Sequence, residues 1–163
     1  NIYRTNNYWK IINKVQYLIC GGLATNLYGV QRMTADIDII LDLNESNLST
    51  FQTTMQKLNY KASLPINIME LANQEKLAYY KKEKNLIAYS YFNLKKEFIP
   101  LDVITEFPYS FKEMWNRKRI EKDLDFEMYI IELNDLIEMK SRAGRNQDLT
   151  DVIYLKKVRD EKD

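Results

Sequence analysis

The sequence predicts an α/β protein, more narrowly one of the α+β kind, in which a mixed sheet of about five strands has flanking helices and a C-terminal helical pair. Short apolar, β-branched runs alternate with longer segments of helical spacing along the chain. Two of these runs, at 86–92 and 98–105, are separated only by the turn-like segment 93–97, which predicts a hairpin. Gly144 interrupts the last helical pattern and predicts two consecutive helices.

The N-terminal half contains a helix and strand pattern with recognisable ends. The expected helices lie at 8–15, 22–29, 47–58 and 70–83, and the expected strands at 16–20 and 36–42. Gly29 ends the second helix, and Ser46 is the expected N-cap of the third. Residues 62–69 are ambiguous because Pro65 interrupts them.

The C-terminal half continues the same alternation. After the hairpin we expect helices at 110–116, 135–143 and 147–159 and strands at 118–121 and 126–132. Asn134 or Asp135 caps the helix that Gly144 closes. Pro100 cannot donate a hydrogen bond to a neighbouring strand, so the second hairpin strand begins near this residue or lies at an edge of the sheet.

Composition limits the chemistry that this sequence can perform. The 163 residues are 45% hydrophobic, enough for a sizeable core, and the formal net charge of +1 gives no global attraction to nucleic acid. A single cysteine and no histidine exclude an intramolecular disulfide, His/Cys zinc ligation and His-based triads. Carboxylates and hydroxyls remain as the groups that can do chemistry.

Membrane and export signals are also missing from the pattern. No apolar run approaches the ~18–20 residues that a transmembrane helix needs, so we expect no membrane partner. Residues 1–7 are too polar to resemble a signal peptide. We therefore expect a cytoplasmic protein.

Two carboxylates lie one residue apart on a predicted strand. Asp36 and Asp38 project from the same face, roughly 7 Å apart, because side chains alternate along a strand. Neighbouring carboxylates raise the pKa of at least one of them unless a cation compensates, and Mg²⁺ prefers such ligands together with waters and phosphates. A metal pair would need a third carboxylate from a neighbouring strand. Asp102, the single acid in an apolar strand, can supply it.

A buried strand also turns through two glycines into a helix shortly before these acids. Together, Gly21-Gly22, Asp36-x-Asp38 and the isolated Asp102 resemble the DNA polymerase β-like nucleotidyltransferase superfamily. Many of its members have Gly-Ser at the turn, where a hydroxyl contacts a phosphate. The second glycine of this chain therefore bears on the choice of substrate, while backbone N–H groups at a helix N-terminus can still hold a phosphate.

A finer resemblance extends over roughly residues 15–158. The pattern Gly-Gly-x-Ala-x(4)-Gly-x-x-Arg-x-Thr-x-Asp-x-Asp at 21–38 is similar to bacterial minimal nucleotidyltransferases related to AbiE-type abortive-infection toxins. The Lys/Arg/Asp tail at 136–151 resembles the segment with which that subgroup ends. The resemblance implies an antitoxin as a candidate partner.

The resemblance implies a nucleotidyltransferase fold in a single domain over 1–163, with a catalytic core at about 15–132 and C-terminal helices at about 135–159. Asp36, Asp38 and Asp102 are the expected catalytic and metal-binding residues, with Mg²⁺ or Mn²⁺ as the cofactor. The expected reaction moves a nucleoside monophosphate from a nucleoside triphosphate, such as ATP, to an acceptor hydroxyl. RNA, a protein and a small molecule all fit as the acceptor.

Five further residues are expected to bind the nucleotide. Gly21 and Gly22 offer backbone N–H groups to a phosphate, or form only a tight turn. Arg32 either reaches the triphosphate or pairs with an acid, and Thr34 either contacts the nucleotide or only fixes the loop before the strand. Lys140 is expected to neutralise triphosphate charge.

Two further alternatives stay open, one for the C-terminal charges and one for the function. Arg145, Asp148 and Asp151 either belong to the site or form ordinary surface ion pairs at helical spacing. The alternative function is a non-catalytic component of a toxin-antitoxin or phage-defence system that binds a nucleotide or a partner.

Overall fold

The computed structural model describes residues 6–163, with side chains from residue 8 onward. A seven-stranded mixed sheet runs through the molecule in the order β3-β4-β5-β2-β1-β7-β6. The strands are β1 (Tyr17–Cys20), β2 (Ile37–Leu41), β3 (Tyr60–Ala62), β4 (Ala88–Asn93), β5 (Leu101–Ile104), β6 (Arg119–Lys122) and β7 (Glu127–Ile130). The expectation that residues 1–7 are not a signal peptide concerns a segment whose first five residues lie outside the described part of the chain.

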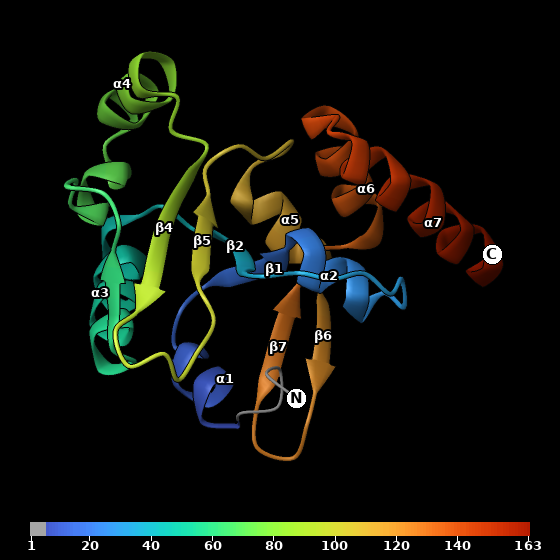
Figure 1. Ribbon diagram of the computed structural model, residues 1–163, viewed down its shortest axis with the longest axis horizontal. Coiled ribbons are helices and arrows are strands. Elements are labelled where there is room, and N and C mark those ends of the chain that lie inside the picture. The colour runs from blue at the N-terminus through green and yellow to red at the C-terminus, as the bar shows by residue number, and fades with distance from the viewer. Residues whose placement is uncertain (1–5) are drawn as a thin grey trace.

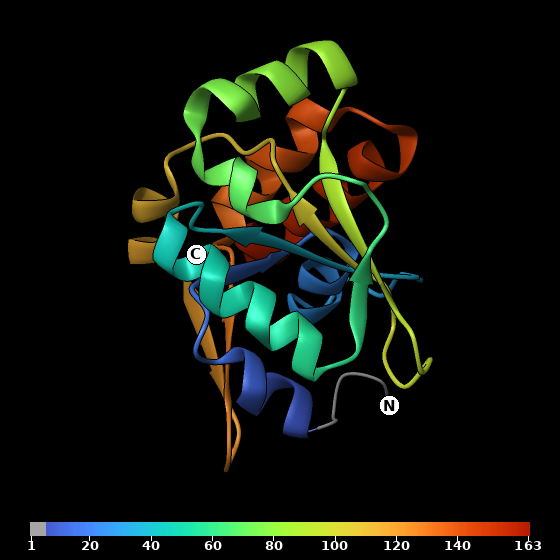
Figure 2. The ribbon, with the colours of Figure 1, turned by 90° about the vertical axis from the view of Figure 1, so that its left-hand side faces the viewer.

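Helices lie between several of the strands along the chain, and also at its C-terminal end (Figures 1 and 2). They are α1 (Asn6–Ile12), α2 (Gly21–Leu27), α3 (Glu45–Lys57), α4 (Gln74–Lys84), α5 (Phe111–Arg117), α6 (Leu133–Ala143) and α7 (Asn146–Lys162), with a short 3₁₀ helix η2 (Ile68–Ala72) before α4. In Figure 1, α3 and α4 lie beside the β3–β4 end of the sheet, and α6 and α7 lie on the opposite side of the molecule. Within residues 6–163, no helix combines the length and the apolar composition that crossing a membrane requires.

The register of the central strands decides which side chains meet. β2 is antiparallel to β1 and parallel to β5. Asp38 on β2 lies directly opposite Asp102 on β5, and opposite Cys20 on β1. Neighbouring residues in register point to the same face of a sheet, so the two carboxylates share one face. Pro100 precedes β5, as predicted, but β5 is an inner strand between β4 and β2.

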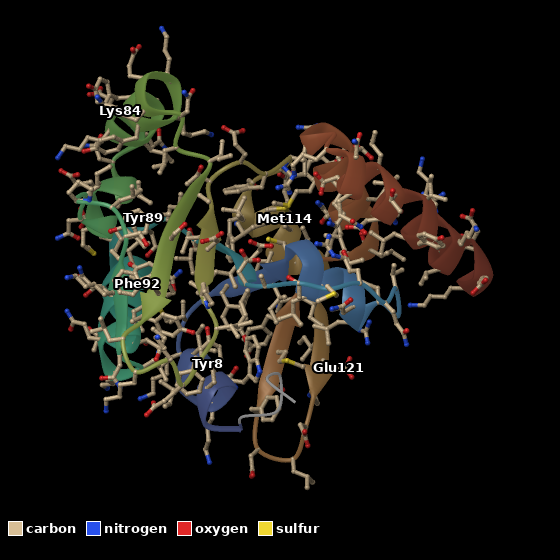
Figure 3. The ribbon with its side chains drawn as sticks, in the orientation of Figure 1. Tyr8, Lys84, Tyr89, Phe92, Met114 and Glu121 are labelled. Atoms are coloured by element: carbon tan, nitrogen blue, oxygen red, sulfur yellow. The ribbon has the colours of Figure 1, made fainter. Side chains whose placement is uncertain are left out.

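The hydrophobic core lies around the inner strands. All four residues of β1 are buried, as expected for a strand that is covered on both faces. Tyr8 on α1, Tyr89 on β4 and Met114 on α5 belong to this core (Figure 3). The side chain of Asn47 on α3 ties the ends of β1 and β2 together, because its amide donates to the carbonyl oxygens of Gln16 and Asp42 at 2.9 and 2.8 Å.

The sheet is larger than predicted, with seven strands instead of about five. β3 was not predicted, because it is only three residues long and adjoins the ambiguous segment around Pro65. It pairs antiparallel with β4, so the sheet pairing rather than local propensity defines it. The predicted hairpin is confirmed by the antiparallel pairing of β4 with β5.

Three predicted helix starts were wrong by a few residues. The N-cap of α3 is Asn44, whose side chain accepts a hydrogen bond from the N–H of Asn47, instead of Ser46. The predicted helix over 70–83 is η2 followed by α4. The N-cap of α6 is Glu132, which accepts from two backbone N–H groups, instead of Asn134 or Asp135. For α3 and α6 an earlier side chain provides the cap, whereas α4 begins only after η2, with Asn73 as its cap.

The C-terminal helical pair is as predicted. Gly144 follows α6 with φ of +66°, the left-handed conformation that ends a helix, and its N–H donates to the carbonyl oxygen of Lys140 at 3.0 Å. The chain then turns back into α7, which packs along α6. This turn brings residues of α7 next to residues of α6 that helical spacing alone would keep apart.

Candidate active site

The turn from β1 into α2 requires glycine at both positions. Gly21 has φ of +63°, and a Cβ atom there would lie 1.9 Å from Oδ2 of Asp38. A Cβ atom on Gly22 would lie 2.7 Å from Oγ1 of Thr34. The missing side chains let Asp38 and the loop before β2 approach the first turn of α2, where the backbone N–H of Gly22 donates to the carboxylate of Asp38.

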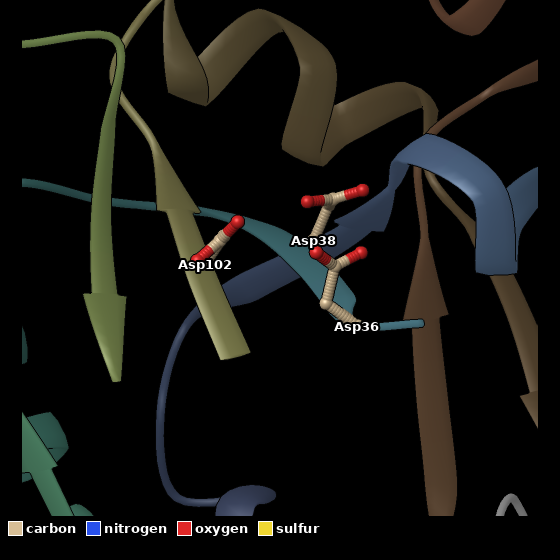
Figure 4. A group of neighbouring side chains, drawn as sticks. All are labelled: Asp36, Asp38 and Asp102. Carbon is tan, nitrogen blue, oxygen red and sulfur yellow. The ribbon is translucent and has the colours of Figure 1, made fainter. Parts of the chain in front are cut away.

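Three carboxylates meet above the inner strands. Asp36 immediately precedes β2, Asp38 lies on β2 and Asp102 lies on β5 (Figure 4). Each offers a carboxylate oxygen, and these oxygens lie within 4.8 Å of one another. Figure 4 shows Asp102 on the β5 side of the group and Asp36 and Asp38 next to each other on the β2 side. The structure therefore brings together the three acids singled out in the sequence.

The three acids repel one another. Burial, together with the charges of Asp36 and Asp102, raises the pKa of Asp38 to about 6. Burial and the charge of Asp102 likewise raise the pKa of Asp36. Half-buried carboxylates at this spacing favour either a proton or a cation between them. Three oxygen ligands of this kind match the donor set that Mg²⁺ and Mn²⁺ prefer.

Arg32 and Thr34, which were expected at the nucleotide, both have partners in the protein. Nη1 of Arg32 lies 2.6 Å from Oδ2 of Asp151 on α7. Oγ1 of Thr34 donates to the carbonyl oxygen of Asp36 at 3.1 Å and so fixes the loop that carries the first aspartate. Both residues nevertheless line the cavity described below.

Lys140 is buried between two acids of α7. Its Nζ lies 2.8 Å from Oδ2 of Asp151 and 3.6 Å from Oδ1 of Asp148. The Lys140 side chain is only 5% exposed, and those of both acids are less exposed still. Burial alone would raise the pKa of Asp151, but hydrogen bonds from Lys140, Gln147 and Arg32 hold it below its ordinary value. The pair thus fixes α7 against α6.

Arg145 is the exposed cation of this group. Its Nε lies 2.7 Å from Oδ2 of Asp148, while its side chain is 81% exposed. The hydrogen bonds from Arg145 to Asp148 raise the pKa of Arg145, and the charges of Asp38 and Asp36 raise it further. Arg145, Asp148 and Asp151 are therefore part of the site's surroundings and not only surface pairs. In the sequence, only the spacing of these residues after Lys140 pointed to them. That spacing does not show how α7 packs against α6, and this packing is what brings them to Lys140.

One cavity of about 750 Å³ joins these groups. The glycine turn, the three acids, Arg32, Thr34, Lys140, Arg145 and Asp148 line it. A second set of lining residues was not singled out in the sequence: Ile87, Ala88, Ile104, Phe107, Pro108, Leu136 and Met139. These apolar residues carry no sequence signal that separates them from ordinary strand, loop and helix residues. A volume of this size is typical of sites for small molecules and cofactors.

Comparison with known proteins supports the fold expectation. No family model matches the chain, and no curated protein matches it. Among solved structures, the chain is similar to the crystal structure of the lincosamide antibiotic adenylyltransferase LnuA with lincomycin bound, with a TM-score of 0.61 and 16% sequence identity. The match covers 97% of this chain and 99% of that chain. The chain therefore shares the overall fold of that adenylyltransferase.

Proposed function

We propose that the protein is a metal-dependent nucleotidyltransferase, which moves a nucleoside monophosphate from a nucleoside triphosphate to an acceptor hydroxyl. The observation that carries the proposal is the convergence of Asp36, Asp38 and Asp102 within 4.8 Å in the lining of a cavity, in a fold shared with an adenylyltransferase. A surface cluster of acids would not require two glycines beside it, whereas here the first turn of α2 closes directly over Asp38.

Asp36, Asp38 and Asp102 would hold Mg²⁺ or Mn²⁺. The raised pKa of Asp38 supports this role, because burial and the charges of Asp36 and Asp102 outweigh the lowering effect of Lys140, and a bound cation would offset them. When bound, the metal supplies neutralisation of the triphosphate charge and a lowered pKa of the acceptor hydroxyl. The rest of the catalytic effect comes from positioning and fixed charges, so a chain without histidine can perform it.

The triphosphate lies, in this proposal, over the glycine turn and towards the α6–α7 pair. Gly21, Gly22, Arg32 and Thr34 line this part of the cavity. Lys140 also lines the cavity, and its ammonium group is held in place by Asp151 and Asp148. We add Arg145 to the nucleotide-binding residues, because it is a cation that a triphosphate can reach without breaking a buried ion pair.

The finer assignments rest on the sequence pattern. We propose that the protein belongs to the AbiE-type subgroup, with an antitoxin as a candidate partner and a cytoplasmic location. The glycine, Arg-x-Thr-x-Asp-x-Asp and Lys/Arg/Asp patterns support the subgroup. ATP is the first triphosphate to test, because the solved neighbour is described as an adenylyltransferase.

A label-transfer assay tests the proposal. The protein is incubated with each α-labelled triphosphate and Mg²⁺ or Mn²⁺, with total RNA, cell protein or a small-molecule extract as acceptors. Separate Asp36→Ala, Asp38→Ala and Asp102→Ala variants should abolish transfer, since each removes a metal ligand. Arg145→Ala should reduce the rate about 10²–10³-fold, the usual effect of removing one charge-stabilising contact.

An exposed acid provides the matched control. Asp125→Asn changes one carboxylate on the β6–β7 hairpin, outside the cavity, and should leave transfer unchanged. Tight triphosphate binding without transfer to any pool would instead favour the nucleotide-binding component without catalysis. Transfer that survives Asp102→Ala would remove the role given to that residue.

A further inference from the structure

The cavity has two halves of different chemistry. The apolar half comes from the start of β4, from β5 and from the connection between β5 and α5, and it contains Ile87, Ala88, Ile104, Phe107 and Pro108. Ile87 is 67% exposed, so it presents apolar surface without a protein partner to cover it. The polar half contains the glycine turn, the cations of the loop before β2 and of the α6–α7 pair, and Asp148, with Leu136 and Met139 of α6 beside them.

Asp102 lies where the two halves meet. It shares β5 with Ile104, two residues further on and therefore on the same face. Ala88 lies opposite Ile104 in the register of β4 and β5, so the apolar surface begins directly beside Asp102. Figure 4 shows Asp102 on β5 at one side of the group, with Asp38 on β2 and Asp36 just before β2 at the other side, and Gly21 of α2 lies next to Asp38. The acids therefore separate the apolar half from the polar half.

The proposed reaction assigns a role to each half. In phosphoryl-type transfer the attacking and leaving oxygens are roughly in line, on opposite sides of the phosphorus. Pyrophosphate leaves towards positive charge. On the polar side Arg32, Lys140 and Arg145 outnumber their two acidic partners, Asp148 and Asp151, by one charge, and Arg145 is the exposed cation of the group. The acceptor hydroxyl then approaches from the opposite side, where the apolar half lies. This assignment rests on the proposed nucleotidyl transfer.

The charges around the cavity disfavour a polyanion as the acceptor. Its lining contains four cations and five carboxylates, and three of these carboxylates are the proposed metal ligands. One of these carboxylates, Glu106, lies in the apolar half and pairs with Lys81 at 2.9 Å. A polynucleotide would need several free cations to contact its phosphates. Lys81 is therefore occupied by Glu106, and the exposed Lys82 and Lys84 at the end of α4 lie outside the cavity lining.

We propose that the apolar half is the acceptor site and that it takes a small molecule with a hydroxyl group, an apolar body and no negative charge. The acceptor oxygen forms a bond to the α-phosphorus. The bond from that phosphorus to the bridging oxygen breaks, pyrophosphate leaves with the electron pair, and the hydroxyl proton passes to water. The acceptor becomes a nucleoside monophosphate ester.

The first test asks which pool carries the label. The full chain is incubated with α-labelled triphosphate, Mg²⁺ and an unfractionated bacterial lysate, and the products are separated by a 3 kDa filter, nuclease and protease. The proposal predicts label in a small, nuclease- and protease-resistant product that a reversed-phase column retains. Label in RNA or protein overturns it. So does triphosphate binding without label in any pool, whereas failure to bind any triphosphate contradicts the proposed function itself.

Three variants test the location of the acceptor site. Ile87→Lys places a charge on the exposed apolar surface and should raise the apparent KM for the small-molecule fraction at least about tenfold, while the Kd for the triphosphate stays within about twofold. Ile153→Lys is the matched control, because Ile153 is an exposed isoleucine on α7 outside the cavity. Lys82→Glu should change neither value.

Two outcomes of this series overturn the proposal. An equal loss of triphosphate binding and acceptor use in Ile87→Lys would place the nucleotide, instead of the acceptor, in the apolar half. Loss of acceptor use in Lys82→Glu with no change in Ile87→Lys would assign acceptor binding to the basic end of α4, as a polynucleotide acceptor requires.

Discussion

Replacing Asp38 by Asn removes a carboxylate that the metal-free fold holds at a cost. Burial and the charges of Asp36 and Asp102 raise the pKa of Asp38 from 3.8 to about 6. A shift of roughly two units corresponds to about 3 kcal/mol of free energy between the protonation states. The N–H of Gly22 can still donate to the amide oxygen of the new side chain, so the variant keeps that contact. We expect Asp38→Asn to be about 1–3 kcal/mol more stable than the wild type at pH 8 without metal.

The sign of the pH dependence follows from the direction of the shift. The folded pKa lies above that of the unfolded chain, so the folded state binds more protons between pH 3.8 and about 6. The contribution of Asp38 to stability therefore falls as pH rises through this window. At pH 4.5 the advantage of Asp38→Asn should shrink to about 1 kcal/mol or less.

Urea unfolding in EDTA at pH 8 and pH 4.5 measures both values. Asp125→Asn, the same chemical change at an exposed position, should show no such dependence. Adding Mg²⁺ should stabilise the wild type more than Asp38→Asn, because the variant lacks one metal ligand. A loss of several kcal/mol in Asp38→Asn at pH 8 without metal would refute the reasoning. It would show that protein donors satisfy the carboxylate and that Asp38 is structural.

Two further substitutions test the supports of the site. Lys140→Met leaves Asp151 buried without its main partner and should lower the free energy of unfolding by about 3–5 kcal/mol at pH 7 in urea titrations; a change below about 1 kcal/mol would contradict the buried pair. Gly21→Ala puts a Cβ atom 1.9 Å from Asp38 and should cost stability and abolish triphosphate binding, whereas Gly144→Ala, also at positive φ but with no neighbour closer than 3.8 Å, should cost only about 1–2 kcal/mol. Equal losses in both alanine variants, measured by thermal unfolding and calorimetry, would show that the close approach at the turn is unimportant.

The part of the site formed by continuous segments could be predicted from the sequence. The glycines, Asp36 and Asp38 lie within one strand-helix-strand unit, where local periodicity defines the elements and their faces. Asp102 could be added because it is a single acid in an apolar strand, and parallel pairing with β2 places it opposite Asp38.

The remaining contacts depend on tertiary packing. Arg32 and Asp151 are 119 residues apart in the sequence, and only the packing of α7 against α6, and of α6 against α2, brings them to 2.6 Å. Lys140 and Asp148 lie on different helices, on either side of the turn at Gly144. β3 likewise exists because β4 offers it a partner, and not because its three residues strongly favour a strand.

The central claim is that three aspartates bind a triphosphate through a divalent metal. Calorimetric titration of ATP, GTP, CTP and UTP, in millimolar Mg²⁺ and in EDTA, tests it most directly. The account predicts that the wild type binds at least one triphosphate only with the metal, and that separate Asp38→Asn and Asp102→Asn variants lose this binding while remaining folded. A triphosphate at 100 times its Kd should also add about 2.7 kcal/mol of stability. Binding that is unchanged in EDTA and in both variants, or no binding of any triphosphate, would contradict the account.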